Sequence, residues 1–324
     1  MKNVVIIVPE SSVLQAIADP QYCFEATNQF LENMGKKPLF RVVLAGKKRS
    51  IKLNNGRYVV HTDALLPEIK KADIIFIPAL AGNLEVALSL NSGILPWIRE
   101  QHARGAEIAS LCLGAFLLAE TGLLNDGKCS THWGFAREFR LMYPEVELVD
   151  GGIITESNGI YSSGGANSYW NLLLHLVEKH TSREISILVA KYFAVDIDRD
   201  SQSSFSIFQG QKTHPDGIIL KAQELIEKSI NKKISVEDIA EQLALGRRSL
   251  ERRFKSATGN SVLEYIQRVK MEVEKRNFET TMKTIHEVMY TIGYNDIKAF
   301  RTTFKKITGI TPVAYRNKYL KRTN

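Results

Sequence analysis

The sequence predicts an α/β domain with a doubly wound, mostly parallel sheet, followed by an all-α domain with two helix-turn-helix motifs. Strand-length apolar runs alternate with helical patterns in the first part of the chain. A polar, turn-forming stretch follows, and two similar helix-turn-helix patterns occupy the last third. A chain of 324 residues is long enough for two or three domains. We therefore expect an α/β domain over residues 1–195, a linker over 196–215 and a helical domain over 216–324.

Three apolar runs have the length and composition of buried parallel strands: VVIIV at 4–8, DIIFIP at 73–78 and EIASLC at 107–112. Strands that are covered on both faces read as continuous apolar runs. Helical patterns alternate with them, at 24–34, 94–104, 114–121, 133–142, 167–179 and 183–193. This alternation is typical of a flavodoxin-like, doubly wound sheet.

The cysteines and histidines give no sign of a disulfide framework or a metal site. Cys23, Cys112 and Cys129 lack CxxC spacing, and the seven histidines form no HExxH or HxH motif. We expect free thiols in a reducing cytoplasm, with no metal and no cofactor. The first apolar run is five residues long, far short of a signal peptide or membrane span. We therefore expect a cytoplasmic protein without a membrane partner.

Cys112 follows a predicted strand and directly precedes Leu113 and Gly114, where a helix is predicted to begin. At such a turn, helix N-terminal N–H groups favour a thiolate and can stabilise an oxyanion, which predicts a lowered pKa for this thiol. His132 follows the strand-like segment KCST at 128–131, and strand ends converge at the carboxyl edge of a doubly wound sheet. The spacing alone leaves two alternatives open, a ligand site or a small buried thiol with a capping histidine.

The last third of the chain repeats one pattern, in which a short amphipathic helix, a break and a basic second helix follow one another. The positions expected to be buried are apolar and three or four residues apart: Ile239, Leu243, Leu250 and Phe254, then Ile285, Val288, Met289, Ile292, Phe300 and Phe304. Gly293 suits a turn with positive φ between two helices. A basic helix with its apolar side buried is what insertion into a major groove requires.

The charge distribution agrees with a polyanionic partner for this region. Residues 210–324 carry 23 Lys and Arg against 13 Asp and Glu, whereas the whole chain has a net charge of +8. The excess of positive charge therefore lies in the C-terminal third, which indicates double-stranded DNA as the partner. Charge alone is equally compatible with a solvated basic bundle, and the two repeated motifs favour DNA.

The segments DIAEQLALGRRSLERRFKSATG at 238–259 and IGYNDIKAFRTTFKKITGITPVAYR at 292–316 resemble the AraC/XylS family of transcription regulators. The resemblance implies two recognition helices that read successive faces of the major groove. It assigns DNA contacts to these residues: Arg247, Arg248, Glu251, Arg252, Ile297, Lys298, Arg301 and Thr302. The chain departs from the family at Thr302, where Arg is common, and Arg301 at the neighbouring position is expected to meet phosphate.

The segment ASLCLGAFLLAETGLLNDGKCSTHW at 109–133 resembles the ThiJ/PfpI superfamily, whose fold is that of class I glutamine amidotransferases. IPALAGN at 77–83 and SQSSF at 201–205 extend the resemblance to GlxA-type regulators, which join such a domain to an AraC module. The resemblance implies a ligand pocket formed by Gly82, Cys112, Leu113 and His132.

The two resemblances together imply a ligand-responsive transcription regulator that dimerises through the α/β domain. A small molecule or the redox state is the expected effector, and RNA polymerase is a partner if the protein activates. We expect no enzyme activity, because Gln15 lies near the position of the family's catalytic glutamate and Leu113 stands where protease-like members have histidine. The alternative is an amidase- or glyoxalase-like cysteine enzyme with an autoregulatory DNA-binding appendage.

Overall fold

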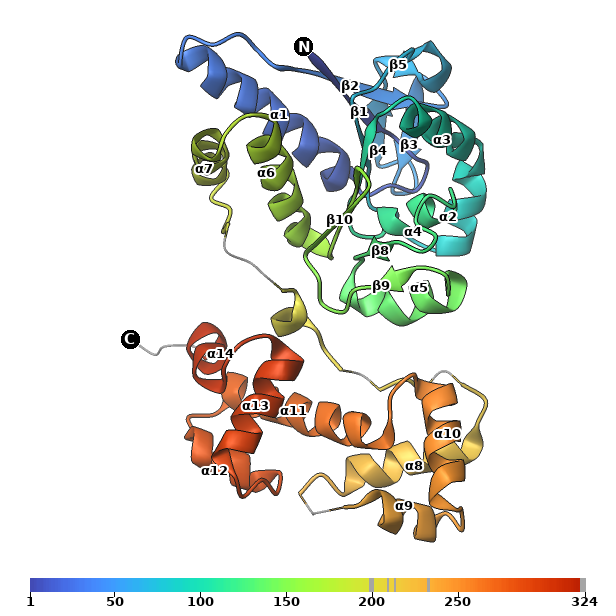
Figure 1. Cartoon of the computed structure of the whole chain (residues 1–324), viewed down its shortest axis with the longest axis vertical. Helices are drawn as coiled ribbons and strands as arrows, with labels where there is room; N and C mark the ends of the chain where they lie inside the picture. Colours follow the sequence, from blue (N-terminus) through green and yellow to red (C-terminus); the bar gives the residue numbers. More distant parts are fainter. Residues whose placement is uncertain (198–200, 209, 213, 232–233, 321–324) are drawn as a thin grey trace. The chain divides into compact units, whose positions relative to one another are not determined.

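The computed structural model describes residues 1–197, 201–208, 210–212, 214–231 and 234–320. These residues form two compact units, Met1–Gln202 and Ser203–Asn324, coloured blue to yellow and yellow to red in Figure 1. The change from one unit to the other falls inside the segment predicted as a linker, 196–215. Residues 198–200, 209 and 213 of that segment lie outside the described residues.

The first unit is built on a seven-stranded sheet in the order β10-β11-β7-β6-β1-β2-β5. The strands are β1 (Lys2–Ile7), β2 (Phe40–Gly46), β5 (Ala64–Leu65), β6 (Ile74–Ile77), β7 (Glu107–Ser110), β10 (Ile154–Ser157) and β11 (Ile160–Ser163). Every neighbouring pair is parallel except β10 and β11. The predicted fold class is confirmed, and the three apolar runs form β1, β6 and β7 at the centre of the sheet.

Helices cover both faces of this sheet, as Figure 1 shows. On one face lie α1 (Leu14–Asn33), α6 (Tyr169–His180) and α7 (Arg183–Tyr192); on the other lie α2 (Leu84–Asn91), α3 (Leu95–Ala103), α4 (Gly114–Ala119) and α5 (Ala136–Met142). Along β1, Val4 and Ile6 enter the first core, whereas Val5 and Ile7 enter the second. The apolar run at residues 4–8 is unbroken because alternate side chains of β1 are buried on the two faces of the sheet.

Two elements differ from the sequence-based expectation. Helix α1 begins ten residues before the predicted start at residue 24 and runs through Pro20, because Ala16, Ile17 and Pro20 continue the buried face toward Phe24. The strand expected at 128–131 is the short β8 (Lys128–Cys129). It pairs with β9 (Glu147–Leu148) in a separate two-stranded sheet. A second small sheet joins β3 (Ser50–Leu53) to β4 (Tyr58–His61).

All the regular secondary structure in the described part of the second unit is helical. Its helices are α8 (Gly217–Lys228), α9 (Val236–Gln242), α10 (Arg247–Thr258), α11 (Val262–Thr280), α12 (Ile285–Thr291), α13 (Ile297–Thr308) and α14 (Pro312–Tyr319). Helices α9 and α10 pack on one apolar core with α8, and α12 and α13 pack on another with α14. Helix α11 contributes Tyr265 to the first core and Phe278 to the second, so it joins the two helix pairs.

The turns inside the two helix pairs are built differently. Gly293 lies between α12 and α13 with φ of 75°, as its position predicts, whereas Ala244 takes the corresponding place in the first pair with φ of 51°. A left-handed conformation costs alanine more than glycine. Ser235 and Thr284 begin α9 and α12 with capping boxes, which satisfy the first backbone N–H groups. None of the helices within the described residues has the length and apolar character needed to cross a membrane.

Candidate functional site

Cys112 lies at the sharp turn between β7 and α4, with a φ of 54°. The backbone N–H of Cys112 lies 3.4 Å from the Ser163 Oγ that accepts it, and the backbone N–H groups of Leu113 and Ala166 face its sulfur. Gly114 allows α4 to approach β6, since a Cβ at this position would lie 2.4 Å from the carbonyl oxygen of Ile77. The strand, the turn and the glycine together hold the thiol at the carboxyl edge of the sheet.

The expected lowering of the Cys112 pKa is wrong. Burial raises the pKa of this thiol, and the opposing effect of the Ala166 and Leu113 N–H groups is smaller. Removing a thiolate from water costs more free energy than the N–H of Leu113, at the start of the six-residue α4, and the N–H of Ala166 together return. Burial also raises the pKa of Cys23 and raises that of Cys129 to about 12.

His132 lies beside the turn but forms no hydrogen bond with Cys112 in the described part of the chain. Its Nδ1 accepts the N–H of Gly134 at 3.0 Å, and burial lowers its pKa, which favours the neutral ring. The hydroxyl of Thr131 donates to the carbonyl oxygen of Cys112 at 3.1 Å, so the two segments are in contact. The ring of His132 therefore acts as a helix cap, which is one of the alternatives that the sequence left open.

Gln202, which the sequence did not single out, holds the segments around Cys112 together. Its Oε1 accepts the N–H groups of Trp133 and Gly165 at 3.3 and 3.0 Å. Its Nε2 donates to the carbonyl oxygens of Thr131 and Gly152 at 2.8 and 3.0 Å. The residue is only 2% exposed and is the last residue of the first unit. A buried amide with four backbone partners fixes the positions of the loops that it connects.

Of the other residues singled out in the sequence, Leu113 contributes its backbone N–H beside the Cys112 sulfur. Gly82 is in the exposed loop between β6 and α2, with φ of 79°. Gln15 is exposed on α1 and donates to Oδ1 of Asn167 at 3.2 Å. One turn further along α1, Asp19 accepts the hydroxyl of Tyr169 at 2.6 Å and the Trp170 Nε1–H at 3.0 Å.

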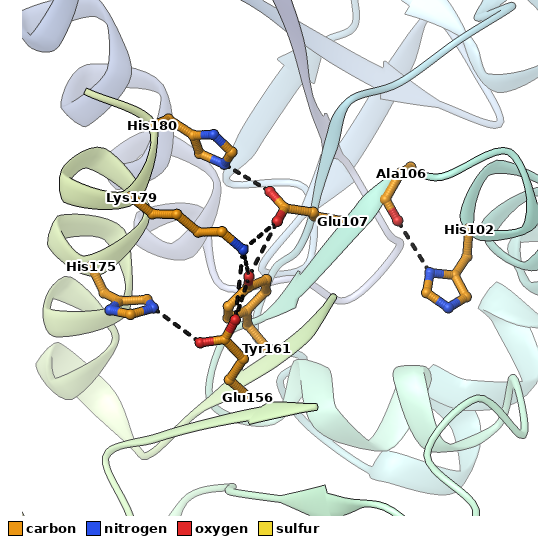
Figure 2. A network of polar contacts seen from close by, with 8 residues as sticks. All are labelled: His102, Ala106, Glu107, Glu156, Tyr161, His175, Lys179 and His180. Atoms are coloured by element: carbon orange, nitrogen blue, oxygen red, sulfur yellow. Dashed lines mark hydrogen bonds and ion pairs between the residues drawn. The ribbon is translucent and has the colours of Figure 1, made fainter. Parts of the chain in front are cut away.

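A polar network, drawn in Figure 2, lies around Glu107 at the start of β7, whereas Cys112 follows the end of that strand. Glu107 at the start of β7 lies 2.6 Å from Lys179 Nζ and 2.7 Å from His180 Nε2. Burial raises the pKa of Glu107, but the hydrogen bonds from His180 and Lys179 reverse this and lower it to about 2. Tyr161 donates to Glu156 at 2.8 Å within the same network. These contacts attach the end of α6 to β7 and β11, far along β7 from Cys112.

In the second unit, α10 presents Arg248 and Arg252 as exposed side chains, while Leu250 and Phe254 are buried. Arg247 forms an ion pair with Glu237 and also lies 3.2 Å from Glu251. Arg247 and Glu251, both predicted to contact DNA, are therefore paired with each other. Two further bonds anchor α10, because Arg253 donates to Asp216, the N-cap of α8, at 2.6 and 2.9 Å.

Helix α13 exposes Lys298, Arg301 and Thr302, with Phe300 and Phe304 buried on its other side. Ile297 differs from them because it is partly buried and packs against the core of the second helix pair. Both α10 and α13 therefore combine an apolar buried side with an exposed side rich in donors, the arrangement that the major groove accepts.

Two family models match the chain. The model of the DJ-1/PfpI family matches residues 27–179, and a helix-turn-helix domain model matches residues 239–318. The HTH-type transcriptional regulator GlxA of Rhizobium meliloti is 22% identical over 292 residues, covering 87% of this chain and 86% of GlxA. The HTH-type transcriptional regulator GbdR of Pseudomonas aeruginosa is 24% identical over 237 residues, covering 72% of this chain and 64% of GbdR, less than two thirds of its length.

Solved structures also resemble the fold of the first unit. The crystal structure of an AraC family transcriptional regulator from Pseudomonas putida aligns with a TM-score of 0.51 at 16% identity. The alignment covers 60% of this chain and 100% of that chain. The resemblances to the two families that the sequence indicated are thereby confirmed.

Proposed function

We propose that this chain, which joins a DJ-1/PfpI-family domain to an AraC-type helix-turn-helix domain, is a sequence-specific DNA-binding transcription regulator. The single observation that carries the proposal is the pair of basic helices, α10 and α13, each exposing donors while its apolar side is buried. GlxA and GbdR, to which the chain is similar, are named transcriptional regulators.

The proposed DNA-reading surface consists of exposed side chains on α10 and α13. Arg248 and Arg252 can each donate two bonds to guanine, and Glu251 can accept from cytosine once Arg247 turns to a phosphate. Lys298 and Thr302 face the second groove segment, and Arg301 meets the backbone. Ile297, partly buried, offers only an apolar edge, which suits a thymine methyl group. The second helix pair then discriminates less sharply between sequences than the first.

The first unit is proposed to sense a small molecule or the redox state and to dimerise in the cytoplasm. Gly82, Cys112, Leu113 and His132 are the proposed ligand contacts from the family resemblance. Gln202 supports this role, because it connects the loops beside Cys112 to the residue where the DNA-binding unit begins. RNA polymerase is a further proposed partner if binding activates transcription.

An enzyme of the amidase or glyoxalase class is the second candidate, which the Cys112 turn alone favours. Three observations argue against turnover. The pKa of Cys112 is raised, His132 makes its bond to Gly134 instead of the thiol, and Gln15 bonds Asn167. A nucleophilic cysteine needs a base to remove its proton and an acid to orient that base. We therefore propose that the Cys112 site is degenerate and that the protein is not an enzyme.

Genome-wide mapping of DNA bound by the full chain tests the regulator directly. We expect discrete sites that share a sequence, and we expect Arg252→Ala to lose them while the protein remains folded. Binding spread evenly over the genome, or sites unchanged in the variant, would contradict the proposal. A parallel assay with amide, ester and 2-oxoaldehyde substrates separates the enzyme candidate, since turnover abolished by Cys112→Ala would establish it.

A further inference from the structure

The segment Ser203–Phe208, at the start of the second unit, contacts both helix pairs of that unit. The sequence placed these residues in the linker of 196–215. They form instead a short turn, η5 (Ser203–Phe205), followed by a stretch whose backbone groups at Ser206 and Phe208 bond to α11. The segment is therefore a structural part of the helical unit.

At its C-terminal end the segment attaches to the first helix pair. Phe208 packs on the core of that pair, and its ring centroid lies 5.1 Å from that of Tyr265 on α11. The Tyr265 ring in turn lies 5.2 Å from the ring of Phe254, on α10. Both contacts are edge-to-face, the arrangement that aromatic pairs prefer. A row of three rings thus connects the segment to α10.

At its N-terminal end the segment attaches to the second helix pair. The carbonyl oxygen of Ser204 accepts the hydroxyl of Tyr319, on α14, at 3.1 Å. The Tyr319 ring lies 4.6 Å from the ring of Tyr315, which lies 5.5 Å from the ring of Phe304 on α13. The turn η5 is itself next to α13. A second row of three rings thus leads from the segment to α13.

A buried ammonium group fixes the middle of the segment to α11. Lys275 is 4% exposed, and its Nζ donates to the carbonyl oxygen of Ser206 and to Oε2 of Glu272, the latter at 2.8 Å. The same carboxylate oxygen accepts the backbone N–H of Phe208 at 3.1 Å. A buried charge is costly unless it is paired and hydrogen-bonded, so these bonds hold the segment to the helix. Ile207, which lies between the two bonded residues, is 49% exposed.

We propose that Ser203–Phe208 is a positioning segment, which holds α10 and α13 in one relative arrangement and so determines the half-site spacing that the protein accepts. The two helix pairs have separate apolar cores, and α11 enters both. A long helix can bend, whereas a second connection that is attached to both pairs opposes bending and rotation of one pair against the other. The consequence for DNA rests on the proposed function, but the arrangement of the helices does not require DNA.

Distances between nitroxide labels at Lys255→Cys on α10 and Lys305→Cys on α13, measured in the full chain by pulsed electron resonance, test the positioning. Both sites are exposed and the three native cysteines are buried, so brief labelling modifies the introduced thiols. We expect one narrow distance distribution for the wild-type segment, and one wider by roughly twofold in Phe208→Ala. Ile207→Ala is the matched control and should keep the narrow distribution.

Tyr319→Phe is a second, milder variant, because it removes the hydroxyl that bonds Ser204 and keeps the ring. It should widen the distribution less than Phe208→Ala does, and it remains informative if Phe208→Ala fails to fold. Phe208→Tyr keeps an aromatic ring at the first core and should restore the narrow distribution.

An operator with one base pair inserted between the half-sites gives a readout of spacing. The insertion moves the second half-site by about 3.4 Å and roughly 35° around the duplex. We expect the wild type, Ile207→Ala and Phe208→Tyr to lose at least about tenfold in affinity on this DNA, and Phe208→Ala to lose less than about threefold.

Two results would overturn the proposal. The first is a distance distribution that stays narrow in both Phe208→Ala and Tyr319→Phe. The second is a spacing preference of Phe208→Ala equal to that of the wild type while its melting temperature falls, which would make the segment a stabilising element only. A wild type that selects no DNA sequence would contradict the proposed function, and the label distances would then still decide the positioning.

Discussion

The Oε1 atom of Gln202 accepts the backbone N–H of Gly165 at 3.0 Å. Gly165 in turn lies directly beneath the ring of His132, because a Cβ added to it would come within 2.0 Å of His132 Cδ2. Three residues distant in the sequence therefore form one closely packed layer next to Cys112. A change in any of them is transmitted to the other two, since interiors of this density cannot absorb an extra atom without movement.

Gly165→Ala should displace His132 and destabilise the first unit by about 1–3 kcal/mol, as overpacking usually does. The φ of Gly165 is −74°, so backbone strain does not contribute and the effect is steric. Thermal unfolding of the full chain measures it. Gly93→Ala is the matched control, because its added Cβ meets only the flexible end of Lys47 at 3.3 Å. Equal melting temperatures for the two variants would show that the His132 ring moves aside freely.

Cys112 should react with iodoacetamide before Cys23 and Cys129, because it is 7% exposed and each of the others is 0% exposed. Its pKa is raised above the usual range for a thiol. The thiolate fraction, and hence the labelling rate, should therefore keep rising as the pH increases through that range. Peptide mapping after brief labelling at several pH values checks both expectations. A labelling rate that levels off below about pH 7, as it does for an activated catalytic thiolate, would contradict the expected pH dependence.

Arg252→Ala should weaken operator binding by roughly 1–3 kcal/mol and relax the preference at one base pair, with little effect on random DNA. Arg301→Ala, on α13, is the comparison, since a phosphate contact is lost equally on both kinds of DNA. Competition binding at fixed salt measures the two ratios. Equal losses on operator and random DNA for Arg252→Ala would assign this side chain to the phosphate backbone.

Glu274 should make the second unit less stable as the pH rises. It is fully buried in α11, its Oε2 has no partner in the described structure, and burial raises its pKa to about 8. The folded state keeps the proton, while the unfolded state releases it near the ordinary glutamate pKa of 4.5. The stabilisation is complete below pH 4.5, falls as the pH rises and is lost above about 8.

Glu274→Gln should remove this pH dependence. At pH 8 the variant should unfold at a higher urea concentration than the wild type, with a free energy of unfolding larger by about 1–3 kcal/mol. Urea unfolding at pH 6 and pH 8 makes the comparison. Glu241→Gln is the control, because Glu241 is exposed on the same unit. Identical pH profiles for wild type and Glu274→Gln would mean that Glu274 is ionised in the folded protein.

A fragment beginning at Ser203 should fold and bind DNA as a monomer, about 10²-fold more weakly than the full chain. The start matters, because Phe208 packs on the first helical core and the Ser204 carbonyl oxygen accepts the Tyr319 hydroxyl at 3.1 Å. A fragment beginning at residue 216 lacks both contacts and should be less stable. Sedimentation and operator titration decide; a dimeric fragment, or full operator affinity, would place dimerisation in the helical unit.

Local sequence patterns predicted the elements whose environment they determine. The unbroken apolar runs predicted β1, β6 and β7, since only strands covered on both faces tolerate such composition. The apolar run that ends at Cys112, followed by Gly114, likewise predicted the turn between β7 and α4. Apolar spacing also predicted that Phe254 and Phe304 are buried.

Features that depend on distant contacts were not predictable. The sign of the Cys112 pKa shift follows from how deeply the fold buries the thiol, which spacing does not reveal. Gln202 lies in a polar stretch that reads as a linker, and its role comes from four backbone groups at Thr131, Trp133, Gly152 and Gly165. The extension of α1 through Pro20 likewise depends on the sheet beneath it.

Helix α11 extends from Val262 to Thr280 and enters both helical cores. At 1.5 Å per residue, its 19 residues measure about 28 Å. The helix thus acts as a spacer that sets how far apart, and at what rotation, α10 and α13 lie. Each residue inserted into α11 would turn the second helix pair relative to the first by about 100° and move it by about 1.5 Å, so the length of α11 fixes how α10 and α13 are placed relative to each other.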